Sequence, residues 1–173
     1  DVCSSDLGGT NSVTNTFTVV VNAVNDAPTI DAIANVTVDE DSSAQTVALS
    51  GIGVGAANET SQTLSVTAAS SNTAIIPNPT VTYTSPNATG SLVFTPAANA
   101  NGTVTVTVTV TDSGGTANGG VNTTTSTFTI ALNSVNDAPT LAAITSVTIN
   151  EDASTQTVNF TGVGMGNGDV GQT

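Results

Sequence analysis

The chain has 173 residues, 13 Asp and Glu side chains and no Lys, Arg or His, which gives a formal net charge of −13 at pH 7. Nucleic-acid binding is excluded because neutralising phosphates requires cationic side chains, and attraction to an anionic membrane surface is excluded for the same reason. Salt bridges between side chains are equally impossible, so each carboxylate must face water, accept hydrogen bonds or bind a cation.

Residues 1–7 are interpreted as a translated sequencing adapter and not as native sequence. They include Cys3, the single cysteine of the chain, so no internal disulfide bond can form. The absence of Lys also excludes a stapling isopeptide bond between Lys and Asn or Asp. A bound cation is therefore the remaining way to staple the fold. No run of about 18 apolar residues occurs, so the sequence contains no candidate membrane span.

Seven short stretches in which apolar and polar residues alternate predict strands. The first five are modest and cover 36–38, 46–49, 63–68, 81–83 and 91–94. The sixth, 103–111, alternates four valines with five threonines, which predicts a strand with valines inward and threonines outward. The seventh, 127–132, is expected to pair antiparallel with the sixth across a long loop of turn residues.

These strands, separated by regular turn signals and without helical periodicity, predict an all-β sandwich. Its core must consist of Val, Ile, Leu and a few Phe, because Trp is absent. The glycine-rich stretch 51–55 is interpreted as a turn or bulge. A phosphate-binding loop would need a lysine and a following helix, and the sequence offers neither.

A six-residue motif, Val-Asn-Asp-Ala-Pro-Thr, occupies 24–29 and returns 111 residues later at 135–140. Glu40 and Asp41 return at the same offset as Glu151 and Asp152. A fixed period of this size predicts tandem structural units. On this basis residues 8–27 are the last strand of one unit, residues 28–138 are a complete unit, and residues 139–173 begin the next.

The Asn-Asp-Ala-Pro motif resembles that of the cadherin-like repeats of large bacterial surface proteins. The resemblance extends to Val38-Asp39-Glu40-Asp41 and to the later stretches 93–96, 101–103 and 110–114. The resemblance implies a Greek-key, immunoglobulin-like β-sandwich of about seven strands, extracellular or on the cell surface, that acts in adhesion or as a stalk. It also implies calcium at the junctions between repeats. The implied partners are other repeats of the array and a receptor on a cell surface or matrix.

Strand geometry distributes the candidate calcium ligands over both ends of the unit. An extended segment from Pro28 to Glu40 covers roughly 40 Å, so Glu40 is expected at the end where Asp137 leads into the next unit. Asp112 is expected at the opposite end, beside Asp26. Calcium takes six to eight oxygen ligands, which carboxylate, amide and backbone oxygens can supply together. The candidate ligands are Asp26, Glu40, Asp41, Asp112, Asn136, Asp137, Glu151 and Asp152.

Catalysis is not expected, because the chain lacks His and Lys, and carboxylate-based glycoside chemistry usually needs aromatic platforms as well. Two other functions stay open: a self-assembling filament subunit that exchanges strands with its neighbours, and a non-catalytic accessory module of a secreted hydrolase. The acidic residues also have a plainer interpretation. Asp and Asn beside Pro are ordinary turn residues, and 39–41 would then be a solvated strand end.

Overall fold

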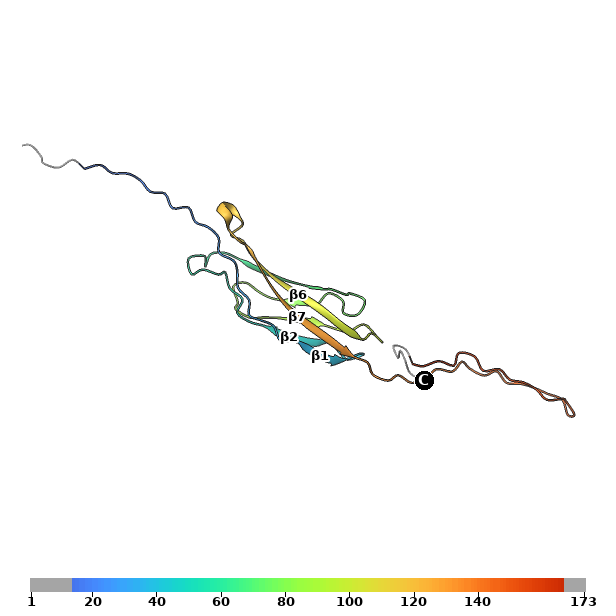
Figure 1. The fold of residues 1–173 in the computed structure, drawn as a ribbon. Helices are drawn as coiled ribbons and strands as arrows, with labels where there is room; N and C mark the ends of the chain where they lie inside the picture. The colour runs from blue at the N-terminus through green and yellow to red at the C-terminus, as the bar shows by residue number, and fades with distance from the viewer. Residues whose placement is uncertain (1–13, 167–173) are drawn as a thin grey trace, which may run out of the picture.

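A β-sandwich lies between two extended segments in the computed structural model, which describes residues 14–166 (Figure 1). The interpretation of residues 1–7 as an adapter concerns residues outside this range. The strands are β1 (Val36–Asp39), β2 (Gln45–Leu49), β3 (Leu64–Ser70), β4 (Thr80–Thr82), β5 (Gly90–Phe94), β6 (Gly102–Asp112) and β7 (Thr123–Asn133).

The predicted all-β class is confirmed, and each of the seven predicted stretches falls within one strand to within one residue at either end. The described residues contain one short 3-10 turn, Ala117–Gly119, and no α-helix. No helix in the described part of the chain is long and apolar enough to cross a membrane. β7 begins four residues before the predicted start, because its first residues are a Thr-Thr-Thr-Ser run in which no apolar alternation is visible.

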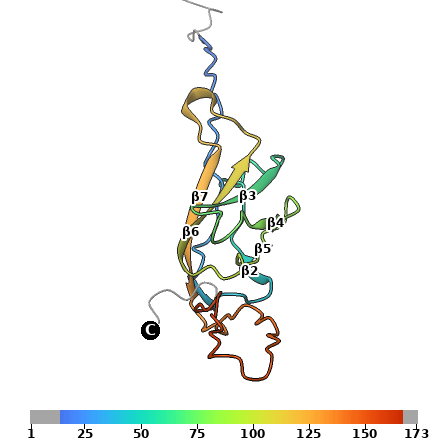
Figure 2. The same ribbon diagram turned by 90° about the vertical axis from the view of Figure 1, so that its right-hand side faces the viewer.

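The strands form two sheets, in the orders β1-β7-β6-β3 and β2-β5-β4. Figure 2 shows β6 and β7 in one layer and β2 and β5 in the other. β6 and β7 pair antiparallel from Gly102 opposite Leu132 to Thr111 opposite Thr123, which confirms the predicted hairpin. β1 pairs parallel with β7, so the first and last strands of the unit lie side by side in a Greek-key, immunoglobulin-like arrangement.

The segment from Pro28 to Glu40 is divided between the two sheets and is not one continuous strand as predicted. The Thr29 N–H donates to the Gly53 carbonyl at 2.9 Å and the Asp31 N–H to the Ser50 carbonyl at 3.0 Å, on the side of β2. The chain then crosses over, and β1 joins β7 in the other sheet. Ile30, Ile33 and Val36, which pack against the core, are three residues apart, so the period-two alternation of a single strand is interrupted where the chain crosses.

The core lies between the two sheets and is aliphatic. The four valines of β6 are fully buried while its threonines face outward, as predicted. They pack with apolar side chains of β2, β5 and β7 in one cluster. Burial of apolar surface is the main stabilising term in a fold that has no disulfide and no salt bridge. The buried members are Leu49, Ile52, Leu64, Ile76, Leu92, Phe94, Val104, Val106, Val108, Val110, Phe128, Ile130 and Leu132.

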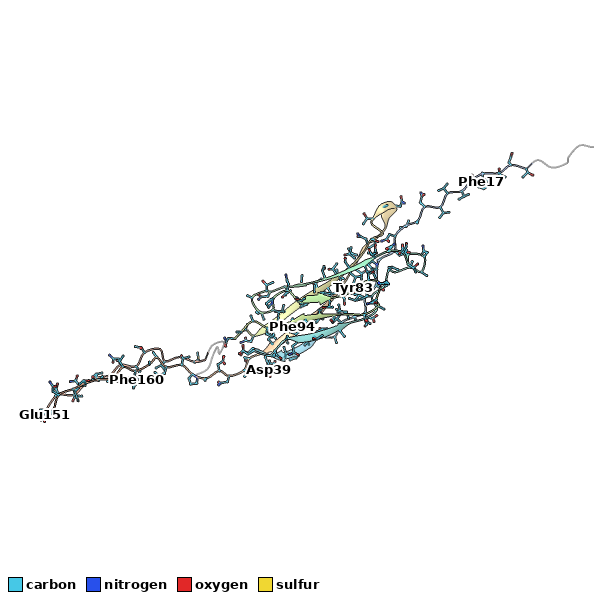
Figure 3. The ribbon with its side chains drawn as sticks, turned by 180° about the vertical axis from the view of Figure 1, so that it is seen from behind. Phe17, Asp39, Tyr83, Phe94, Glu151 and Phe160 are labelled. Carbon is cyan, nitrogen blue, oxygen red and sulfur yellow. The ribbon has the colours of Figure 1, made fainter. Side chains whose placement is uncertain are left out.

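The two extended segments leave the sandwich at opposite ends (Figures 1 and 3). We call the end contacted by residues 23–26 the N-terminal end, and the end that β7 reaches at Asn133 the C-terminal end. Phe17 lies on one extension and Phe160 on the other, both away from the sandwich (Figure 3). The placement of the ends agrees with the strand geometry used above to position the candidate ligands.

Candidate functional site at the ends of the sandwich

At the N-terminal end, the side chain of Asn25 is held by three parts of the sandwich. Its amide nitrogen donates to both carboxylate oxygens of Asp112, at 3.0 and 3.3 Å, and to the Val121 carbonyl at 2.6 Å. Its amide oxygen accepts from Gln62 Nε2 at 2.7 Å. The Val121 N–H in turn donates to the Asn25 carbonyl at 3.0 Å. This linker residue is therefore bound on both its side chain and its backbone.

Two glycines leave the space that Asn25 occupies. A Cβ at Gly114 would overlap the amide of Asn25, and a Cβ at Gly120 would lie 2.9 Å from the Cβ of Asn25. Neither glycine has a positive φ. Close approach of the linker, and not backbone conformation, is thus what requires glycine here.

Glu59 is a site residue that sequence reasoning missed. It lies in the loop between β2 and β3, is 7% exposed, and accepts the Asp26 N–H through Oε1 at 3.0 Å. Its second oxygen, Oε2, is buried without a hydrogen-bond partner, and so is Oε1 of Gln62. Both residues line a pocket of about 220 Å³ together with Asn25, Asn58 and Ser61. One signal was available, because Glu59 is the single acidic residue between Asp41 and Asp112.

Asp112 lies at the same end as Asp26, where strand geometry predicted it. The Asp112 carboxylate is buried and accepts the Gly114 N–H at 2.8 Å in addition to the amide of Asn25. Hydrogen bonds to the ionised form stabilise a buried carboxylate that has no cation nearby. Backbone and amide donors thus take the place that Lys or Arg would fill in most proteins.

At the C-terminal end, Glu40 has the position that Glu59 has at the N-terminal end. It is 3% exposed, and its Oε1 accepts the Val135 N–H at 2.8 Å, two residues before Asp137. Its own N–H donates to the Asn133 carbonyl at 2.9 Å. Its Oε2 is buried without a hydrogen-bond partner, as is the hydroxyl of Ser42. Glu40 and the linker that contains Asp137 therefore meet at this end.

Asp41 serves a neighbouring turn. It has φ 59°, in the left-handed region, and its Oδ1 accepts the Asn99 N–H at 2.9 Å. The side chain of Asp39, which is exposed while that of Glu40 is buried, accepts from the Asn133 amide at 3.1 Å. The three consecutive acidic residues thus have three different partners.

The remaining candidates lie on the C-terminal extension. Asn136 donates to the Asp137 carbonyl at 3.1 Å. Glu151 and Asp152 are exposed, and Figure 3 shows Glu151 at the tip of this extension. Local geometry here follows that of the complete unit, since Thr140 pairs with Gly164 as Thr29 does with Gly53.

Single oxygen atoms at the two ends suit calcium, but the described residues form no complete set of ligands. Each end presents a buried glutamate oxygen without a partner, Glu59 Oε2 or Glu40 Oε2, which suits a cation that prefers oxygen ligands. Within residues 14–166, no group of three His, Cys, Asp or Glu side chains could hold a metal ion. The predicted junction draws its ligands from two consecutive units, so a role for any of these residues in binding metal stays a prediction.

Comparison with known protein families agrees with this architecture. The family model of the bacterial Ig domain matches residues 25–130, which is well over half of the chain. The chain belongs to the bacterial Ig domain family. This Ig unit begins at the linker residue Asn25, so the match includes the contacts of Asn25 with Asp112 and Gln62.

Among solved structures, this chain is similar to that of titin domains z1z2 in complex with telethonin. It is 15% identical to this chain, with a TM-score of 0.42, and the match covers 70% of this chain and 55% of that one. This chain thus spans about half the length of that two-domain chain. No curated protein sequence matches this chain.

Proposed function

We propose that this Ig unit is a structural, non-catalytic module of a cell-surface or secreted protein, in which similar units follow one another in tandem as an adhesive stalk. Bacterial Ig domains commonly occur in surface proteins and are typically structural. Entry and exit of the chain at opposite ends of the sandwich suit an end-to-end array (Figure 1). In such an array the module supplies spacing and reach.

Exposed apolar side chains on both extensions support the tandem arrangement. Phe17 is 88% exposed, whereas Phe128, its counterpart 111 residues later, is 2% exposed in the core. On the other extension, Phe160 is 64% exposed, and its counterpart Leu49 is 1% exposed. Side chains that repeat the core pattern require a sandwich of their own to be buried, and neighbouring units would provide it.

Strand exchange between copies accounts for these side chains less well. The extension at 14–23 corresponds to β7, and the extension at 139–166 corresponds to β1 and β2. Pairing two copies through these extensions would leave β3, β4, β5 and β6 without counterparts. The second sheet could not form, so the apolar faces would stay exposed to water. We therefore favour the array over the filament.

We further propose that calcium stiffens the joints between units. The observation that carries this proposal is the pair of buried glutamate oxygens without partners, one at each end of the sandwich, in a chain with no basic residue. Leaving such oxygens unsatisfied costs about 1–3 kcal/mol each, which a cation would offset. At a joint, Glu40 and Asp137 would face Glu59-type and Asp112-type carboxylates of the next unit.

A calcium titration tests this proposal. Residues 25–138 followed directly by a second copy of residues 28–138, which keeps the 111-residue period at the joint, would be melted in EGTA and in rising calcium, followed by circular dichroism. We expect the melting temperature to rise with calcium, because a ligand that binds only the folded state stabilises it. Sodium chloride at matched ionic strength is the control for screening of the negative charge. An unchanged melting temperature in calcium would show that the joints bind no cation.

A further inference from the structure

We propose that the linker between consecutive units is gripped from both sides by hydrogen bonds, so that the joint is ordered even without a cation. The unit that follows holds the linker through Asn25, and the unit before holds it through Glu40. This inference rests on the tandem arrangement proposed above, and it makes Asn25 and Glu40 positioning residues of the joint.

The grip by the following unit is seen at residues 23–26. The Ala23 carbonyl accepts from the Asn118 side chain at 3.4 Å, and the Asp26 N–H donates to Glu59. Between them lies Asn25, with its bonds to Asp112, Gln62 and Val121. These contacts come from two loops that are separate in sequence, so the linker cannot swing without breaking several hydrogen bonds together.

The grip by the preceding unit is seen at residues 133–135. The Val135 N–H is held by the buried carboxylate of Glu40, and the Asn133 carbonyl accepts the Glu40 N–H. The backbone bond continues the parallel pairing of β1 with β7, and the side-chain bond carries the attachment two residues beyond Asn133. A hydrogen bond to a charged acceptor is among the stronger kinds, so Val135 is fixed to the sandwich that precedes it.

The 111-residue offset places these two grips on adjacent residues. Val135 corresponds to Val24, and Asn136 corresponds to Asn25. The part of the next unit that the structure describes repeats the local bonds of the complete one, including that from the Thr140 hydroxyl to the Gly162 carbonyl, which matches Thr29 with Gly51. At a complete joint, a valine bound by the unit before is thus followed directly by an asparagine bound by the unit after.

Every linker residue is then held by one unit or the other. Backbone rotation is confined to the ψ angle of the valine and the φ angle of the asparagine that follows it. The grip engages one oxygen of each glutamate, Glu40 Oε1 and Glu59 Oε1, and leaves each Oε2 for a cation. A cation would therefore add to an ordered joint. It would not create the order.

NMR of the full chain in EGTA tests the two grips separately. Residues 23–26 should give heteronuclear NOE values like those of the strands, whereas residues 136–138, whose following unit is incomplete here, should give lower values. Asn25→Ala should speed amide exchange at Asp26 and Val121 by roughly tenfold or more. Asn136→Ala is the matched control, because that side chain bonds only to the nearby Asp137 carbonyl within the described residues.

The second grip has a matched pair of its own. Glu40→Ala should speed exchange of the Val135 amide, and Glu151→Ala, at the equivalent exposed position, should leave that amide unchanged. Flexible NOE values at 23–26 in EGTA would overturn the proposal even if a variant failed to fold. Order that appears at 23–26 only with calcium would also overturn it, while the calcium-bound joint of the proposed function would stand. Order at 23–26 together with no calcium binding would support the hydrogen-bonded joint and contradict the calcium-bound joint.

Discussion

Glu59→Gln should change the stability of the sandwich by different amounts with and without calcium. Gln keeps the oxygen that accepts the Asp26 N–H but removes a buried charge whose second oxygen has no partner. Its new amide group would also introduce a donor into a pocket that holds a second buried acceptor without a partner, Gln62 Oε1. Without a cation, the variant should therefore be the more stable protein.

The expected magnitudes follow from these contacts. Satisfying one buried acceptor is worth about 1–3 kcal/mol, and for a domain of this size each kcal/mol raises the melting temperature by about 4–8 °C. In EGTA the variant should thus melt at least about 4 °C above the wild type. Calcium at 100 times its dissociation constant would add about 2.7 kcal/mol to the wild type alone. Calcium should therefore narrow the difference between the two melting temperatures by that amount, and the order reverses where the gain of the variant in EGTA is below about 2.7 kcal/mol.

Thermal melts of the two-unit protein, unchanged and with Glu59→Gln in its second unit, in EGTA and in calcium, followed by far-ultraviolet circular dichroism, give all four values. In the full chain in EGTA, Glu151→Gln is the control, because it removes the same charge from an exposed position and reports the effect of net charge alone. A variant that melts below the wild type in EGTA would show that the Glu59 carboxylate is already satisfied within the chain. Equal gains from calcium in both proteins would show that Glu59 is no ligand.

Two further predictions concern the sandwich itself. Phe128→Ala should lower the free energy of unfolding by about 3–5 kcal/mol, a large part of the stability of a small domain. Phe17→Ala should change it little, because Phe17 lies on the exposed extension. Urea denaturation measures both, and equal losses would contradict the assigned unit. Gly51→Ala should cost more than Gly115→Ala. Both glycines have positive φ, worth about 1–2 kcal/mol of strain for alanine, but only at Gly51 would a Cβ also overlap a side chain, that of Asp31; equal melting temperatures would contradict this.

Much of the fold could be predicted because its strands show a local alternation of apolar and polar residues. The Val-Thr alternation of β6 places every valine in the core, and the same reasoning locates β7 from Phe128 to Leu132. The crossing of the first strand between sheets could not be predicted in this way. Which sheet receives Thr29 depends on a partner, Gly53, that lies 24 positions away and that the sequence of the segment does not identify.

The ends of the sandwich show a similar division. Distance along extended strands was sufficient to place Glu40 near the outgoing linker and Asp112 near the incoming one. The partner of Asp112 was not foreseen, because the amide of Asn25 reaches it from 87 positions away in the sequence. Glu59 was missed for the same reason. Its importance comes from burial in a loop, and no periodic pattern marks a loop residue as buried.

The absence of basic residues explains why the two ends look alike. A buried carboxylate needs donors, and a chain without Lys, Arg or His can supply only N–H and hydroxyl groups. Backbone N–H groups of the linker are the donors closest to the ends, so Glu40 and Glu59 each bind one, at Val135 and Asp26. The same hydrogen bond then neutralises part of a charge and fixes the linker to the sandwich. A neutral residue at either glutamate position would relieve the charge but weaken this attachment, which links the acidity of the chain to the order of its joints.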